Sequence, residues 1–297
     1  MKKTCIIICG ATASGKTALS LNLAEALGTE IVSADSRQCY RELDIGVARP
    51  TPEELARVPH HFIASHSIHE TVNAAVFEQY ALEKVATIFR EHDVAVVSGG
   101  TGLYIQAFCY GMDDIPAVPV TVTNELQQQY NEQGITWLQQ TLAAHDPVFA
   151  REGEMQNPHR MLRALGVKLA TGRSIKEFYK KQPVQRPFNI IMAGIHWPRQ
   201  LLYERINQRV DQMMAAGLLQ EAEQLFAFRH YKALQTVGYA ELFDHIGGNH
   251  TLERAVELVK QNTRHYAKRQ LTWFNRNNEI TWNSSWTVNG LLALLHQ

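Results

Sequence analysis

The chain has 297 residues, which is enough for one large domain or two modest ones. Its hydrophobic fraction of 45% and charged fraction of 20% are typical of a globular protein, and no apolar run approaches the ~20 residues that span a membrane. We expect no signal peptide, because the early apolar run is short and leads into a glycine loop. Four cysteines without a CxxC pair fit a reducing cytosol, so we expect a cytoplasmic protein with no membrane partner.

The net charge is zero, but it is unevenly distributed. Residues 1–150 carry nine Lys and Arg against 17 Asp and Glu, whereas residues 151–297 carry 20 against 12. Within the basic half, residues 151–186 hold nine basic and three acidic side chains. This asymmetry favours an anionic partner for the second half, although uneven surface charge on an ordinary enzyme would give the same counts.

Strands and helices alternate along much of the chain. Short apolar runs predict buried strands, and apolar residues recurring every three or four positions predict helices. Because strands that alternate with helices form parallel sheets, we predict an α/β fold with helices on both faces of the sheet. The predicted strands span 4–9, 30–34, 94–98 and 189–195. The predicted helices outside the middle of the chain span 17–27, 73–91, 198–216, 218–228, 239–246 and 252–274.

The pattern changes near Asp113. From residue 121 to 181 only helical periodicity is present, whereas strand character precedes and follows this stretch. We therefore predict a catalytic core formed by residues 1–117 and 188–297, interrupted by a mostly helical insertion domain over 118–187.

A phosphate-binding loop is predicted directly after the first strand. The string GATASGKT at 10–17 fits GxxxxGK[ST] and opens a helix, which is the context that the motif requires. Backbone N–H groups of such a loop converge on phosphate oxygens, Lys16 adds a full charge, and the Thr17 hydroxyl can hold Mg²⁺. The residues predicted to bind the phosphates are Gly10, Ala11, Thr12, Ala13, Ser14, Gly15, Lys16 and Thr17.

The loop predicts a polyphosphate ligand without implying nucleotide hydrolysis. A typical ATPase carries an Asp at the end of a later core strand, where it positions Mg²⁺. Here the strand over 94–97 runs into Ser98-Gly99-Gly100-Thr101 and no carboxylate is present. This absence weakens the hypotheses of a motor ATPase or a GTPase.

Asp35 follows the second predicted strand, so it should lie on the same sheet edge as the phosphate loop. A carboxylate there can act as a general base, although a helix cap or surface turn would use the same residue. The glycine-rich turn at 99–104 should reach this edge too, and Thr101 could offer its hydroxyl to a phosphate oxygen. A plain strand-to-helix turn is the alternative.

Basic residues recur on the helices of the second half. Lys260, Arg264 and Lys268 are spaced four residues apart on the last long helix and should form one stripe. Such a stripe suits a nucleic-acid backbone, but a solvated basic face fits equally well. Arg205 and Arg209, one turn apart on another helix, could reach the sheet edge.

Taken together, these strings resemble the tRNA dimethylallyltransferase (isopentenyltransferase) family over nearly the whole chain. The most specific are DSRQCYRELDIGVARP at 35–50 and NTRHYAKRQLTWF at 262–274. Further strings that carry the resemblance are GATASGKT at 10–17, PHHFI at 59–63, SGGTGLY at 98–104, RINQRVDQMMAAGL at 205–218 and VGYAEL at 237–242.

The resemblance implies a P-loop NTPase-like core that binds dimethylallyl diphosphate together with Mg²⁺. Thr17 would coordinate the Mg²⁺. It implies that Asp35 removes a proton from the exocyclic N6 amine of the tRNA adenosine adjacent to the anticodon. Thr101 would contact the bridging oxygen of the leaving diphosphate, and Arg209 would neutralise its growing charge. Cations and hydroxyls at a leaving group stabilise such a transition state.

The resemblance also implies a tRNA surface, in which the insertion grips the anticodon stem-loop. The chain departs from the family pattern at Ala11, where proline is usual, and at Thr123, where an arginine is common. We expect the protein to act as a monomer. The residues implied to contact tRNA are Asp35, Ser36, Arg37, Gln38, Thr101, Thr123, His159, Arg160, Met161, Leu162 and Arg163.

Three other functions compete with prenyl transfer to tRNA. A small-molecule kinase would use the phosphate loop and Asp35 but would leave the basic insertion without a role. An isopentenyltransferase acting on a free adenine nucleotide would not need that insertion either. A protein that only binds RNA would not need Lys16 and Asp35 on one edge.

Overall fold

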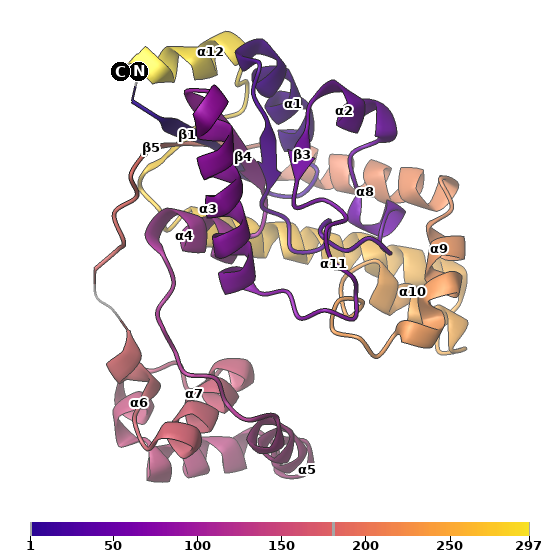
Figure 1. Ribbon diagram of the computed structural model, residues 1–297. Helices are drawn as coiled ribbons and strands as arrows, with labels where there is room; N and C mark the ends of the chain where they lie inside the picture. Colours follow the sequence, from indigo (N-terminus) through magenta and orange to yellow (C-terminus); the bar gives the residue numbers. More distant parts are fainter. Residues whose placement is uncertain (1, 180–181, 297) are drawn as a thin grey trace. The chain divides into compact units, whose positions relative to one another are not determined.

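The computed structural model describes residues 2–179 and 182–296. Six parallel strands form a single sheet in the order β3-β2-β4-β1-β5-β6 (Figure 1). This arrangement confirms the predicted α/β fold with a parallel sheet. The strands span Thr4–Gly10 (β1), Ile31–Ser33 (β2), His60–His61 (β3), Val94–Gly99 (β4), Asn189–Ile195 (β5) and Ile280–Asn283 (β6).

The central strand β1 is buried on both faces, as its unbroken apolar sequence requires. Successive side chains of a strand point to opposite faces. Cys5, Ile7 and Cys9 accordingly pack into one hydrophobic core, whereas Ile6 and Ile8 pack into another. Helices therefore cover both faces of the sheet.

The helices of the core largely match the predicted ranges. Helices α10 and α11 have the predicted bounds, and the remaining predicted helices are found within a few residues of theirs. The helices outside the insertion span Lys16–Leu27 (α1), Pro52–Arg57 (α2), Ala74–Glu91 (α3), Gly102–Tyr110 (α4), Arg199–Ala215 (α8), Leu218–Leu225 (α9), Tyr239–Ile246 (α10), Leu252–Phe274 (α11) and Val288–Ala293 (α12). None of the helices in the described ranges is long and apolar enough to cross a membrane.

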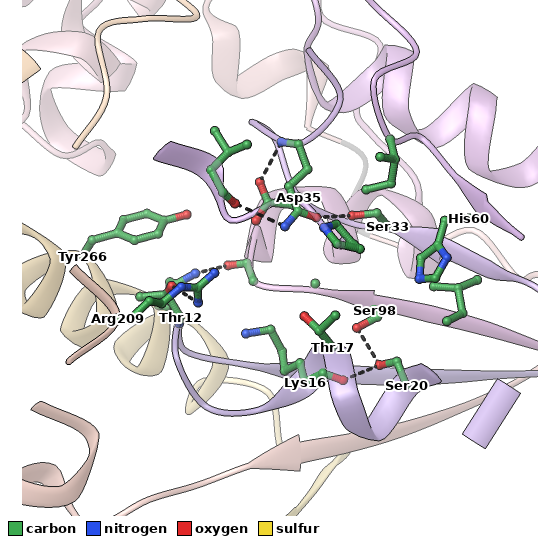
Figure 2. Close-up of a pocket in the computed structure, with 18 residues that line it drawn as sticks. Thr12, Lys16, Thr17, Ser20, Ser33, Asp35, His60, Ser98, Arg209 and Tyr266 are labelled. Carbon is green, nitrogen blue, oxygen red and sulfur yellow. Dashed lines mark hydrogen bonds between the residues drawn. The ribbon is translucent and has the colours of Figure 1, made fainter. Parts of the chain in front are cut away.

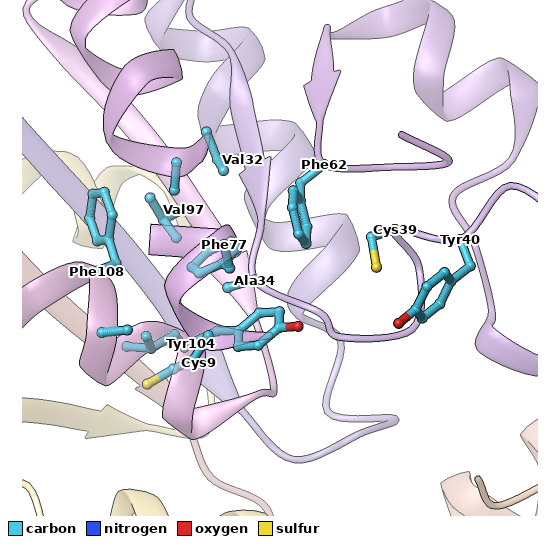
Figure 3. Packing of buried hydrophobic residues seen from close by; sticks show 14 of the residues in the cluster. Cys9, Val32, Ala34, Cys39, Tyr40, Phe62, Phe77, Val97, Tyr104 and Phe108 are labelled. Carbon is cyan, nitrogen blue, oxygen red and sulfur yellow. The ribbon is translucent and has the colours of Figure 1, made fainter. Parts of the chain in front are cut away.

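An aromatic cluster supports the segment that follows β2 (Figure 3). The buried Phe62 ring makes edge contacts with Phe77 and Tyr80, at centroid distances of 5.1 and 5.0 Å, and Phe77 stacks on Tyr104 at 4.6 Å. Cys39 and Tyr40 are buried in the same core. The chain just after Asp35 is thus anchored by large apolar side chains, which is what a fixed catalytic group requires.

The insertion forms its own compact unit, Met112–Val184, and the core comprises Met1–Gly111 and Gln185–Gln297. The sequence placed these boundaries a few residues later, at 118 and 187. Lys180 and Lys181, which the predicted insertion includes, lie outside the described residues. Its helices span Val120–His145 (α5), Pro147–Glu152 (α6) and Pro158–Thr171 (α7), with a short 3-10 helix at Ile175–Phe178.

The insertion has a separate hydrophobic core. Leu138, Leu142, Met161 and Leu165 are fully buried between its helices. Helix α5 is bent at Gly134, whose φ of 75° is outside the helical range. This small core accounts for the helical periodicity of the segment.

Candidate active site

The phosphate loop has the geometry that its sequence predicts. Strand β1 ends at Gly10, and α1 begins at Lys16. Gly15 precedes the helix with a φ of 95°, a conformation that favours glycine. A Cβ atom on Gly10 would lie 3.0 Å from the carbonyl oxygen of Ile195 on β5, so this turn also requires a glycine.

Lys16 turns back over the loop, where its Nζ donates to the carbonyl oxygen of Ala11 at 2.6 Å. Desolvation, followed by the charge of Arg209, lowers the pKa of Lys16 to about 8, although Asp35 opposes the shift. Two cations and one carboxylate therefore share a poorly hydrated space. An anionic ligand in this space would relieve the repulsion between the two cations.

This pKa predicts how the binding of an anionic ligand depends on pH. The cationic form of Lys16, which binds an anion, predominates below about pH 8 and is lost as pH rises through that value. We expect the affinity for inorganic diphosphate to fall by up to about tenfold per pH unit above this point. Lys16→Arg should move the decline to higher pH, and an unchanged profile in that variant would show that another group is responsible.

Asp35 and Thr101 lie side by side because β2 and β4 are neighbouring parallel strands. The Asp35 Oδ1 atom accepts the backbone N–H groups of Arg37 at 2.8 Å and Gln38 at 3.3 Å. Thr101 Oγ1 accepts the backbone N–H of Ser36 at 3.0 Å, and the Thr101 N–H donates to the Ala34 carbonyl at 3.2 Å. The turns after the two strands are thus locked together.

Helix α8 brings two guanidinium groups to the phosphate loop. Arg209 Nη1 donates to Thr12 Oγ1 at 3.3 Å, and Arg205 Nε donates to the Ala13 carbonyl at 2.8 Å. Desolvation lowers the pKa of Arg209, and Asp35 partly offsets this effect. The structure therefore confirms that both arginines reach the predicted edge.

Two cavities share lining residues at this edge, and Figure 2 shows the residues that line the first of them. The first has a volume of about 80 Å³ and includes Lys16 and Thr17 in its lining. The second, of about 170 Å³, is lined on one side by apolar residues of α8 such as Val210 and Met213. The residues that line both are Thr12, Asp35, Val47, Arg209 and Tyr266.

Polar contacts organise the loop that contributes Val47. Gln38 Nε2 donates to the carbonyl oxygens of Val47 at 3.2 Å and Ala48 at 2.8 Å. From α9, the Glu221 carboxylate accepts the N–H of Ile45 at 2.7 Å. The loop that carries Val47, which lines both cavities, is therefore held in place by Gln38 and by Glu221.

Sequence reasoning missed residues of α11 that face the cavities. Val259, Thr263, Tyr266 and Gln270 line one or both cavities. Their spacing of four, three and four residues places them on one helical face. This periodicity is a usable signal in the sequence, although the basic residues between these positions define a different face of the helix. Desolvation raises the pKa of the Tyr266 hydroxyl to about 12, so this phenol is neutral at physiological pH.

The basic stripe on α11 is largely engaged within the protein. Lys260 Nζ lies 2.8 Å from the carboxylate of Asp211, and Arg264 donates to Asn207 at 2.7 Å, both on α8. Lys268 remains exposed. The first two residues therefore fasten α11 to α8, and they do not form the continuous solvated stripe that the spacing suggested.

The predicted tRNA-contacting residues of the insertion differ in exposure. His159, Arg160 and Arg163 are exposed near the start of α7, whereas Leu162 is half-buried. Met161 is fully buried in the core of the insertion, so its side chain is not available for the contact that the resemblance implies. Thr123 is exposed at the start of α5, and its hydroxyl donates to the Pro119 carbonyl at 3.2 Å.

Comparisons of the sequence and of the structure with known proteins point to the same kind of protein. The family model of IPP transferase matches residues 38–277. The chain is 44% identical over 279 residues to tRNA dimethylallyltransferase 1 of Bacteroides thetaiotaomicron, covering 94% of this chain and 91% of that protein. A crystal structure of a tRNA isopentenylpyrophosphate transferase from Bacillus halodurans superposes with a TM-score of 0.71 and 36% identity, covering 99% of this chain and 95% of the other.

A third match is a eukaryotic dimethylallyltransferase whose crystal structures follow its action on tRNA. It shows a TM-score of 0.77 and 25% identity, covering 94% of this chain and 73% of the other. The similarity thus extends over both the sheet core and the insertion, and it confirms the resemblance inferred from the motifs. The chain is a transferase that belongs to the IPP transferase family.

Proposed function

We propose that this protein transfers a dimethylallyl group from dimethylallyl diphosphate to the N6 amine of the adenosine adjacent to the anticodon of tRNA, releasing diphosphate. The observation that carries the proposal is the meeting of two cavities at Asp35 and Arg209. One cavity adjoins the phosphate loop, and the other adjoins the segment after Asp35. Two substrates could therefore approach one reaction centre from different sides.

The donor diphosphate binds the phosphate loop in this proposal. Backbone N–H groups at the start of α1, together with Lys16, Arg205 and Arg209, offer a dense positive field. The Thr17 hydroxyl in the lining of this cavity offers one oxygen ligand of the kind that Mg²⁺ prefers, with diphosphate and water completing the set. Bound with diphosphate and water, Mg²⁺ would supply further neutralisation of the leaving group.

The transfer step follows from the placement of the side chains. The adenine nitrogen attacks the allylic carbon, and the bond from that carbon to the diphosphate oxygen breaks. Asp35 accepts the proton lost by the amine, through Oδ2, because Oδ1 holds two backbone N–H groups. Arg209 stabilises charge growing on the diphosphate. The Thr101 hydroxyl, which donates to Ser36 Oγ at 3.3 Å, would turn from Ser36 to donate to the bridging oxygen. The adenosine must leave its base stack to enter, at a cost of a few kcal/mol.

A kinase would also use a phosphate loop, so the donor must be tested directly. The protein should be incubated with tRNA and an equimolar mixture of labelled dimethylallyl diphosphate and γ-labelled ATP. We expect label from the prenyl donor alone to appear in RNA. Phosphate label in RNA or in a small molecule, without prenyl label, would favour the kinase.

The exposed cations of α7 should contribute to tRNA affinity. Each phosphate contact contributes about −0.7 to −0.9 to the slope of log K against log salt. We therefore expect affinity to fall steeply with salt, and the Arg160→Glu, Arg163→Glu double variant to have a shallower slope with unchanged donor KM. Arg90→Glu, which makes half of that charge change at an exposed residue of α3, is the control for each of the two single substitutions. A flat salt dependence for the wild type would contradict tRNA as the substrate.

We further propose that the protein acts on tRNA in the cytoplasm and as a monomer. The phosphate loop, Asp35 and both arginines come from one chain, so the reaction centre needs no second copy.

A further inference from the structure

A buried side-chain amide bridges the two turns that frame the reaction centre. Gln270, on α11, is only 6% exposed. Its Oε1 accepts the backbone N–H of Thr12 at 2.8 Å, and its Nε2 donates to the Gly100 carbonyl at 2.9 Å. Thr12 belongs to the phosphate loop after β1, and Gly100 to the turn after β4. These two strands are paired in the sheet.

The two partners fix the orientation of the amide. A backbone N–H can only donate and a carbonyl can only accept, so the oxygen of Gln270 must face Thr12 and the nitrogen must face Gly100. The fit is also close in space, because a Cβ atom on Gly100 would lie 2.4 Å from Gln270 Nε2. The glycine at 100 is therefore required for the amide to reach this position.

Each bonded group is next to a residue of the proposed chemistry. Thr12 Oγ1 accepts from Arg209, and Gly100 immediately precedes Thr101. Thr101 in turn holds the N–H of Ser36, beside Asp35. The amide thus lies in a continuous chain of contacts that runs from the leaving-group cation to the turn beside the base.

We propose that Gln270 is a positioning residue that fixes the spacing between the phosphate loop and the turn after β4, which carries Thr101. The diphosphate and its bridging oxygen are then held in a fixed position relative to Thr101. The inference rests on the proposed prenyl transfer. Gln270 acts through Thr12 and Gly100, whose bonded N–H and carbonyl groups would otherwise be free to reorient. Loss of alignment at a reaction centre by as little as 1 Å can lower rates about 10²-fold.

Two variants and one control test the proposal. Gln270→Leu removes both hydrogen bonds, and we expect single-turnover transfer at saturating substrates to fall about 10²-fold. Affinity for tRNA should stay within about threefold, because Gln270 is buried. Gln261→Leu, at an exposed position of the same helix, should match the wild type.

The rate of the Gln270→Glu variant should depend on pH in a way that a purely stabilising role of Gln270 would not produce. A protonated carboxyl can accept from Thr12 and donate to Gly100, as the amide does, whereas a carboxylate can only accept. The rate of this variant should approach wild type at low pH and fall as pH rises through the pKa of the new group, relative to the wild-type profile. Lys16, Asp35, Arg209 and Tyr266 line the same cavity in both proteins, so the ratio of the two profiles removes their common contribution.

The outcomes separate the inference from the proposed function. Both variants within about threefold of wild type at every pH, or a Gln270→Glu to wild-type ratio without a pH step, would overturn the positioning role. Because Gln270→Glu is nearly isosteric, the test stands even if Gln270→Leu unfolds. Failure of the wild type to transfer dimethylallyl to tRNA would instead refute the proposed function.

Discussion

Asp35→Asn should lower turnover by about 10²–10⁴-fold, the usual range for general-base catalysis. The substitution nearly keeps the shape and can still accept the N–H groups of Arg37 and Gln38, but the amide cannot take a proton. The loss should appear in kcat more than in the donor KM, because the missing interaction belongs to the transition state. Single-turnover rates and equilibrium binding of both substrates would separate the two effects.

Asp44→Asn is the matched control for this variant. Asp44 is an exposed acid that lies three residues before Val47. It should retain wild-type kinetics. A single-turnover rate for Asp35→Asn within a few-fold of wild type would make Asp35 a residue that only caps its turn. Weaker tRNA binding with intact chemistry at saturation would make it an anchor for the adenosine.

Arg209→Gln should lower kcat by about 10²–10³-fold, the cost of removing one donor to a developing negative charge in a dry site. Gln can still reach toward Thr12 but carries no charge. Arg209→Lys should recover part of the rate, because it restores the charge without the planar fork of a guanidinium. These rates should be measured by single turnover at saturating donor.

Arg199→Gln, at an exposed position near the start of α8, is the control for Arg209 and should leave kcat unchanged. A donor KM that rises with constant kcat in Arg209→Gln would mean that Arg209 binds the ground state and the transition state equally. Arg209 would then have a role in donor affinity without a role in leaving-group departure.

The sheet edge could be predicted from sequence because of a simple rule of topology. Parallel strands present their carboxyl ends at one edge, so Lys16, Asp35 and Thr101 had to lie near one another once their strands were recognised. The structure places Lys16 and Asp35 in the lining of one cavity, and Thr101 bonds the Ser36 N–H beside Asp35 without lining that cavity. The sequence offered Arg209 only as a candidate for this edge. Its helix follows the insertion, and whether the side chain reaches the phosphate loop depends on tertiary packing.

Other parts could not be predicted, each for a physical reason. Strand β3 consists of His60 and His61, too short to show any alternation. Helix α4 follows the glycine-rich turn and has Gln106 as its one strongly polar side chain, too few to give an amphipathic pattern. Gln270 looks like any polar residue of an exposed helix until its two backbone partners, far away in sequence, are known.

The most direct test of the account is the chemical identity and position of the transferred group. Unmodified tRNA should be incubated with the protein, dimethylallyl diphosphate and Mg²⁺, then digested to nucleosides and to oligonucleotides for mass spectrometry. We predict one dimethylallyl group per tRNA, on N6 of the adenosine adjacent to the anticodon, with release of one diphosphate and with strongly reduced product from Asp35→Asn. An unmodified adenosine at that position, or a prenyl group on another nucleotide, would contradict the account.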